Sequence, residues 1–292
     1  MALWAVASSR LDEQENELKW EAFMGRLLFA AILLASSLAA GAASAQPEPF
    51  NEAGVTMGHW HLMSKDIEAN KKIFLAMGGT LISRAGNDAV MFPGVVINLA
   101  LGDEMGEGGT QGTVVNHVGF IVDNVQRRVA EWRSAGVTVL PGGNGRLDQA
   151  YVGTPDGGRI EILEDPTEPM PIRHEHVHLR TLESEVLKAQ DWYARVFGGT
   201  KNMRNDAPVV DLPGVQMRFA DDIAVQAPTR GHILDHIGFD VRDHQAFVAR
   251  LGSLGIALDE PPRRSNSGGW ITYITDPWGT RIEIVERVAQ AQ

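Results

Sequence analysis

The sequence predicts an α+β fold of two tandem domains, each formed by a pair of βαβββ modules. The first observation is an internal repeat in four blocks, with the order kept and the offset drifting only slightly. The matched blocks are 57–66 with 174–183, 93–103 with 213–222, 116–125 with 235–244, and 151–165 with 273–287. The second observation is that each half of the repeat passes twice through a strand, an amphipathic helix and short strands.

The helices are predicted from apolar side chains at helical spacing and from glycines that follow them. Helices are expected over 65–77 and 183–197, ending at the pairs Gly78-Gly79 and Gly198-Gly199, where a left-handed cap fits. In the second modules, Asp123 and Asp243 are the expected N-caps, and Gly136 and Gly255 end the helices. Strands are expected at 137–140, 150–153, 159–164, 271–275 and 281–285.

The 292-residue chain has room for two domains, preceded by an N-terminal extension. Residues 1–45 are expected to be this extension and a secretory signal peptide cleaved after Ala45, with Met24 as an alternative start and a membrane anchor as the alternative interpretation. The expected domains are 54–165 and 174–288, with a linker at 166–173. We therefore expect an exported protein, periplasmic or secreted, with no stable membrane span in its mature part.

Composition excludes several partners and ligands. A net charge of −11 argues against nucleic acid or an anionic membrane as partner. The chain has no cysteine, so a metal site would have to use His, Asp, Glu or water.

Histidines and glutamates recur at matching places in the two halves. His59 and His61 match His176 and His178, His117 matches His236, and Glu161 matches Glu283. Each glutamate stands between isoleucines in "RIEI", so alternation turns it toward a polar neighbour. Two imidazoles and a carboxylate on three strands form a facial triad, which suits Fe(II) and also accepts Mn, Ni or Zn. His174 matches Met57 and is expected at the surface or in the linker.

The motifs "GHWHL", "NHVGF", "DHIGF" and "TDPWGTRIEIVE" resemble the vicinal oxygen chelate superfamily of glyoxalase I, extradiol dioxygenases and bleomycin-resistance proteins. The resemblance covers about residues 55–287 and implies glyoxalase-like domains with a cup-shaped sheet around a divalent metal. It implies one ligand set per domain, taken in chain order: His59, His117 and Glu161 in the first domain, and His176, His236 and Glu283 in the second. His61 and His178 would be acid/base or substrate-contacting groups. A rival interpretation has both histidines of H-x-H on one metal, as in cupins.

The fourth family position separates the subfamilies. A glyoxalase I would need a glutamate in the strand after "PGV", where this chain has Asn98 and Arg218, which we expect to contact substrate. The remaining three-ligand set resembles extradiol dioxygenases, as do Tyr151 and Tyr273, ten residues before each glutamate and candidates for catalysis. Gly102 and Asp221 stand where those enzymes carry a further histidine, which counts against ring cleavage. Arg218 has a further alternative, an ion pair with Asp221 or Asp222.

These resemblances imply a metalloenzyme that is most similar to extradiol dioxygenases and acts on a small substrate with vicinal oxygens. Fe(II) or Mn(II) is the favoured ion, with Zn(II) or Ni(II) as alternatives. A glyoxalase-like lyase or isomerase is the first alternative function. A small-molecule-binding protein that needs no metal, like the bleomycin-resistance proteins, is the second. Monomer and homodimer are both open.

Overall fold

The computed structural model describes residues 48–84, 86–102, 106, 109–266 and 268–288. The expected N-terminal extension, its signal peptide and the cleavage after Ala45 lie outside these residues. Within the described part of the chain, no helix is long and apolar enough to span a membrane.

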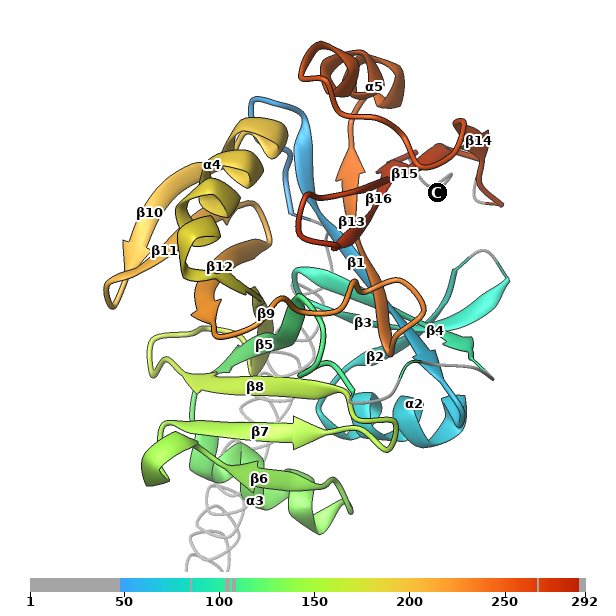
Figure 1. The fold of residues 1–292 in the computed structure, drawn as a ribbon. Helices are drawn as coiled ribbons and strands as arrows, with labels where there is room; N and C mark the ends of the chain where they lie inside the picture. Colours follow the sequence, from blue (N-terminus) through green and yellow to red (C-terminus); the bar gives the residue numbers. More distant parts are fainter. Residues whose placement is uncertain (1–47, 85, 103–105, 107–108, 267, 289–292) are drawn as a thin grey trace, which may run out of the picture. The chain divides into compact units, whose positions relative to one another are not determined.

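Four modules follow one another in the chain (Figure 1). Module 1 consists of β1 (Val55–Ser64), α2 (Ile67–Ala76), β2 (Thr80–Arg84), β3 (Asn87–Phe92) and β4 (Val95–Leu101). Module 2 consists of β5 (Val115–Val122), α3 (Val125–Ser134), β6 (Val139–Pro141), β7 (Gln149–Gly153) and β8 (Arg159–Glu164). Module 3 consists of β9 (Ile172–Leu182), α4 (Val186–Phe197), β10 (Thr200–Arg204), β11 (Ala207–Leu212) and β12 (Val215–Asp222). Module 4 consists of β13 (Leu234–Val241), α5 (His244–Ser253), β14 (Arg263–Arg264), β15 (Trp270–Thr275) and β16 (Arg281–Glu286).

The modules pair into two eight-stranded mixed sheets, which confirms the predicted fold class. The first sheet has the order β14-β15-β16-β13-β1-β4-β3-β2 and joins module 1 to module 4. The second sheet has the order β10-β11-β12-β9-β5-β8-β7-β6 and joins module 2 to module 3. Each half of the repeat, 54–165 and 174–288, therefore contributes one module to each sheet.

The pairing of modules follows from the lengths of the connections. Only residues 165–171 separate β8 from β9, and such a short connection places β9 beside β5, where the two strands pair antiparallel. Modules 2 and 3 thereby complete one sheet, and β13 of module 4 pairs antiparallel with β1. The sheets therefore pair module 1 with module 4 and module 2 with module 3. The repeat predicts a different pairing, of module 1 with module 2 and of module 3 with module 4.

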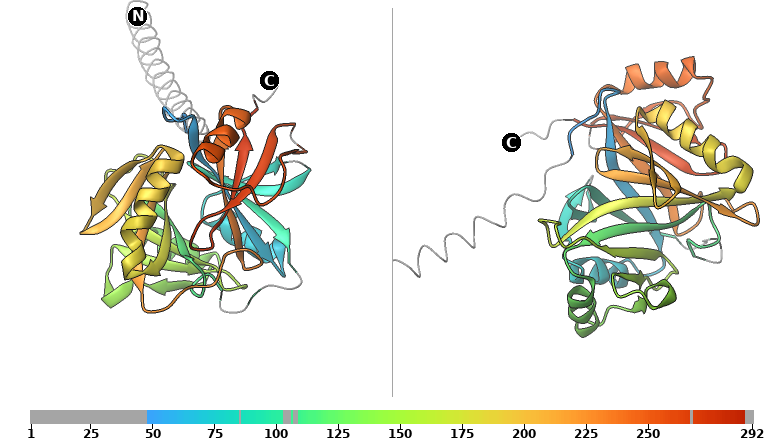
Figure 2. Two further views of the ribbon diagram at one scale, coloured as in Figure 1. Left: turned by 45° about the horizontal axis from the view of Figure 1, so that its top comes forward. Right: turned by 90° about the vertical axis from the view of Figure 1, so that its left-hand side faces the viewer.

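The helices begin and end close to the predicted positions. α5 begins after the expected cap Asp243, whose side chain accepts a hydrogen bond from the backbone N–H of Ala246. α3 begins after Asn124, not Asp123, because Asn124 accepts the bond from Arg127 while Asp123 contacts arginine side chains. Gly198 ends α4 in the left-handed conformation with φ of 69°. α4 packs on β11 and β12 (Figure 2).

Aromatic side chains from the two sheets meet around His174. Trp60 of β1 lies 5.3 Å from Phe120 of β5 and 4.9 Å from the His174 ring, measured between centroids. His174 is fully buried, and its Nδ1 lies 2.8 Å from the carbonyl oxygen of Gly214. The expectation of a surface or linker histidine was wrong, because β9 already begins at Ile172 and directs His174 into this core.

His174 should make stability depend on pH. Burial lowers the pKa of His174 from 6.5 to about 3, so the unfolded state binds the proton first. The neutral ring stabilises the fold above pH 6.5, and this contribution is lost as pH falls from 6.5 toward 3. Between pH 7 and 5, urea titrations of wild type should show about 2 kcal/mol more loss than titrations of His174→Leu. Equal losses in the two proteins would contradict the assignment.

Candidate metal centres

Four β-bulges shape the places where the histidines stand. In β1–β13 and β5–β9 the register slips by one residue at four positions, each directly before a predicted metal-binding histidine. The bulged residues are Gly58, Asn116, Glu175 and Asp235. A bulge interrupts strand alternation and re-aims side chains. The residue before the histidine therefore no longer has to face the opposite side of the sheet.

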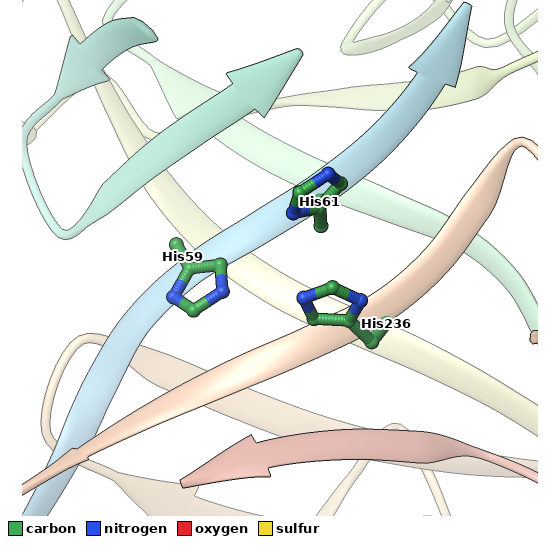
Figure 3. Close-up of side chains that lie close together, drawn as sticks. All are labelled: His59, His61 and His236. Carbon is green, nitrogen blue, oxygen red and sulfur yellow. The ribbon is translucent and has the colours of Figure 1, made fainter. Parts of the chain in front are cut away.

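Centre 1 lies in the first sheet and consists of His59, His61, His236 and Glu283. Glu283 Oε2 lies 2.8 Å from His59 Nε2 and 3.2 Å from His236 Nε2. Figure 3 shows the imidazoles of His59 and His61 on β1 gathered with that of His236 on β13. One ring nitrogen from each lies within 4.8 Å of the others.

Centre 2 lies in the second sheet and consists of His117, His176, His178 and Glu161. Glu161 Oε2 lies 3.1 Å from His176 Nε2 and 3.2 Å from His117 Nε2. His178 Nδ1 lies 3.1 Å from His117 Nε2, and the three imidazoles again meet the 4.8 Å limit. The two centres are therefore built on the same plan from equivalent residues.

The expected division of the ligands between the domains was wrong. Chain order grouped His59 with His117 and Glu161, whereas the structure places His59 beside His236 and Glu283. It likewise places His176 with His117 and Glu161. The reason is the pairing of module 1 with module 4 and of module 2 with module 3. All six predicted ligands do lie in one of the two centres. Two of them exchange places relative to the prediction: His59 belongs to the set with Glu283, and His176 belongs to the set with Glu161.

Three of the bulged side chains hold the ring that follows them. Asp235 Oδ1 lies 2.6 Å from His236 Nδ1, Glu175 contacts His176 Nδ1, and Asn116 Oδ1 lies 2.9 Å from His117 Nδ1. A partner at Nδ1 fixes the ring so that Nε2 faces a metal. Sequence reasoning missed these residues, because neighbours in an unbroken strand face opposite sides.

The fourth bulge has no side chain, and a carboxylate from the opposite strand occupies its place. A Cβ on Gly58 would lie 2.5 Å from Asp240 Oδ1, so only glycine leaves room for that carboxylate. Asp240 also contacts Arg287, with its Oδ2 3.0 Å from the guanidinium Nε. His59 Nδ1 and Asp240 Oδ1 are both buried without a hydrogen-bond partner among the described residues.

Both glutamates are held as carboxylates. Burial would raise their pKa, but contacts with the two histidines of each centre hold the pKa of Glu161 and Glu283 well below the ordinary value. Tyr151 donates a hydrogen bond of 3.1 Å to Glu161, and Gln149, which the sequence did not single out, contacts the same oxygen. Tyr273 pairs with Glu283 in register, as Tyr151 does with Glu161. The predicted tyrosines therefore lie at the centres.

Burial also shifts the pKa of the imidazoles and phenols that lie next to the predicted ligands. Burial and the neighbouring His236 lower the pKa of His61 to about 3, and burial lowers the pKa of His178 well below 6.5. Burial raises the pKa of both Tyr151 and Tyr273. At neutral pH each centre thus has one imidazole that stays neutral and can accept a hydrogen bond, and one phenol that keeps its proton.

The two predicted substrate contacts, Asn98 and Arg218, lie at equivalent positions. Asn98 pairs in register with His61, and Arg218 pairs with His178. Arg218 forms an ion pair with Glu175, and its Nη1 lies 3.9 Å from Glu161 Oε2. This corrects the alternative pairing with Asp221 or Asp222. Beside centre 2, a cavity of about 460 Å³ is lined in part by Glu175, Arg204 and Gln216.

The residues of both centres fit a divalent ion. His59 Nε2 and His176 Nε2 are buried and lack a hydrogen-bond partner among the described residues, although a glutamate oxygen lies within 3.1 Å of each. The Nε2 atom and the glutamate oxygen are thus close together but not aligned for a hydrogen bond. Two ligands of one metal ion have this arrangement, because both point at the ion. Neutral imidazoles and an ionised carboxylate are the donors that Fe(II), Mn(II), Ni(II) and Zn(II) accept.

Comparisons with known proteins identify a related family and a similar fold. The family model of the Glyoxalase/Bleomycin resistance protein/Dioxygenase superfamily matches residues 151–284. The fold is similar to glyoxalase I from Zea mays, at a TM-score of 0.59 and 16% identity over 80% of this chain and 92% of that chain. It is also similar to a putative dioxygenase from Bacillus subtilis, at a TM-score of 0.61 and 16% identity over 82% of this chain and 86% of that chain. No curated protein matches the chain.

Two glycines set how close the histidine rings lie to the sheet. A Cβ on Gly238 would lie 2.0 Å from His59 Cε1, and one on Gly119 would lie 2.0 Å from His176 Cε1. Gly238→Ala should displace His59 and weaken metal binding at centre 1 by roughly tenfold or more, measured by Mn(II) titration. Gly119→Ala should do the same at centre 2.

The matched control is Gly153→Ala on β7, where a Cβ would meet no atom within 4 Å. This variant should bind Mn(II) like wild type. Unchanged binding in Gly238→Ala and Gly119→Ala would show that the positions of the rings do not determine affinity.

Proposed function

We propose that this protein is a divalent-metal enzyme, because residues 151–284 match the Glyoxalase/Bleomycin resistance protein/Dioxygenase superfamily and the rest of the described fold repeats the same module. The activity we propose is similar to that of extradiol dioxygenases, acting on a small substrate with two neighbouring oxygens. The observation that carries the proposal is the convergence of two imidazole Nε2 atoms and one carboxylate oxygen in each centre.

The ligands of centre 1 in this proposal are His59, His236 and Glu283, and those of centre 2 are His176, His117 and Glu161. A bound ion would supply Lewis-acid stabilisation of the substrate oxygens and, if it is iron(II), activation of O₂. Asp235 and Glu175 contact their histidines at Nδ1, which leaves Nε2 as the nitrogen that would bind an ion.

Proton transfer falls to side chains next to the ligands. The His61 ring centroid lies 4.5 Å from that of His236, so its imidazole is placed to hydrogen-bond a substrate hydroxyl at centre 1 and take its proton. Tyr273 keeps its proton and donates a hydrogen bond to a substrate oxygen there. His178 takes the corresponding role at centre 2, where Tyr151 would turn its hydroxyl hydrogen from Glu161 to a substrate oxygen.

A second candidate function rests on the same extra imidazole. One nitrogen of His61 or His178 lies within 4.8 Å of the nitrogens of the other two histidines of its centre. As a fourth ligand, this imidazole would replace the glutamate that glyoxalase I carries where Asn98 and Arg218 stand. The enzyme would then resemble a lyase or isomerase with Zn(II) or Ni(II), and it would consume no O₂.

Metal stoichiometry of single and double variants tests the two centres. Wild type, purified without a histidine tag and titrated anaerobically to saturation, should bind two ions per chain. His59→Ala/His236→Ala should bind one, because both ligands belong to centre 1, whereas His59→Ala/His117→Ala should bind none. His244→Gln, on α5 and outside both centres, should bind two.

The same preparations distinguish the functions. With iron(II), oxygen-electrode traces should show O₂ consumed in step with an added catechol, and His61→Gln should be slower by a factor of about 10²–10⁴. Activity only with zinc or nickel and without O₂ uptake would favour the lyase or isomerase. No ion bound during titration with iron, manganese, zinc or nickel would contradict both and leave a binding protein.

Export is part of the proposal. It rests on the apolar segment before Ala45 and on the Ala43-Ser44-Ala45 sequence. N-terminal sequencing of protein recovered from the periplasm or the medium should begin at Gln46. An intact N-terminus in the cytoplasm would contradict it.

A further inference from the structure

The two centres share their ligands but differ in the charge next to them. Arg84 and Arg204 end equivalent strands, β2 and β10, so that pair is common to both modules. Arg218 has no such counterpart, because the equivalent place beside centre 1 is held by the neutral Asn98. At this one place centre 2 therefore has a positive charge where centre 1 has a neutral side chain.

That charge lies against the ligand carboxylate. Arg218 Nη1 is 3.9 Å from Glu161 Oε2, the same oxygen that approaches His117 and His176. The side chain of Arg218 is only 12% exposed, so water screens it poorly. A divalent ion bound to this oxygen would be placed close to a guanidinium of the same sign.

The neighbouring acid does not cancel this repulsion. Glu175 contacts two arginines, Arg204 and Arg218, whereas Asp240, the carboxylate that fills the equivalent place behind His59, contacts one, Arg287. The negative charge behind His176 is thus already compensated, and centre 2 keeps an excess cation. An anionic ligand on the metal would offset both charges and would accept a hydrogen bond from Arg218 Nη1, since Nε and Nη2 already donate to Gln216 and Glu175.

We propose that the two centres have different tasks: centre 1 holds a divalent ion by itself, and centre 2 binds one tightly only together with a carboxylate-bearing ligand that contacts Arg218. This inference rests on the proposed metal function. It assigns the substrate class of centre 2 as a carboxylate with a second oxygen placed for chelation.

Mn(II) titrations of the full chain, followed by electron paramagnetic resonance, test the division. His236→Ala leaves centre 2 alone, and His117→Ala leaves centre 1 alone. Centre 2 should bind Mn(II) at least tenfold more weakly than centre 1. Adding Arg218→Gln to the His236→Ala chain should strengthen Mn(II) binding at least tenfold, and Asn98→Arg in the His117→Ala chain should weaken it by a similar factor.

The ligand class is tested with oxalate as the probe, by calorimetry on Mn(II)-saturated chains. Adding R218Q to the His236→Ala chain should weaken oxalate binding at centre 2 at least tenfold. In the His117→Ala chain, R218Q should change neither Mn(II) nor oxalate binding, because centre 1 lies in the other sheet. Thermal melting of each variant confirms that it is folded.

Two failures are distinguishable. Equal Mn(II) affinities at the two centres, unchanged by R218Q and Asn98→Arg, would overturn the division of tasks and leave the proposed metal function standing. Loss of all Mn(II) binding in wild type itself would overturn the proposed function and this inference with it.

Discussion

The site depends above all on the antiparallel pairing of β1 with β13 and of β5 with β9. Each pair brings together the first strands of two modules, and those strands carry the histidines. The parallel neighbours β16 and β8 then place Glu283 and Glu161 beside Gly238 and Gly119, the two glycines over which the rings lie. Without the two antiparallel pairs, no histidine of one module would reach the glutamate of another.

The sequence alone predicts the four modules, but it does not predict which modules share a sheet. Strand alternation and the repeat predict His59, His176 and the two glutamates, because these depend on local spacing. Long-range contacts and the lengths of the connections decide which modules share a sheet, and the internal repeat contains no information on either. The bulges could not be predicted for a related reason. The register slip before His236 exists only between two paired strands. The sequence "DH" alone therefore predicts an aspartate on the opposite face of the sheet from the histidine.

Burial of the glutamates favours a positively charged partner at each centre. A carboxylate transferred from water into a sheet costs several kcal/mol unless partners compensate it. Glu283 is 8% exposed and lies between His59 and His236, which donate to it only if they carry a proton on Nε2. Burial alone would lower the pKa of His236, but Asp235 at Nδ1 and Glu283 at Nε2 raise it above its ordinary value, so the ring is held between two carboxylates. A bound divalent ion would replace the proton on Nε2, because the Nε2 atoms and the carboxylate would then share one positive charge.

The same reasoning explains why a single arginine separates the centres. Water screens Arg218 poorly, so its charge would lower the affinity of Glu161 for a cation unless neighbouring acids compensate it. The contact of Arg218 with Glu175 removes part of this but cannot remove all, since Arg204 competes for the same carboxylate. The two centres thus share the types of their ligands, and the side chains at one equivalent place, the amide of Asn98 and the guanidinium of Arg218, differ in charge.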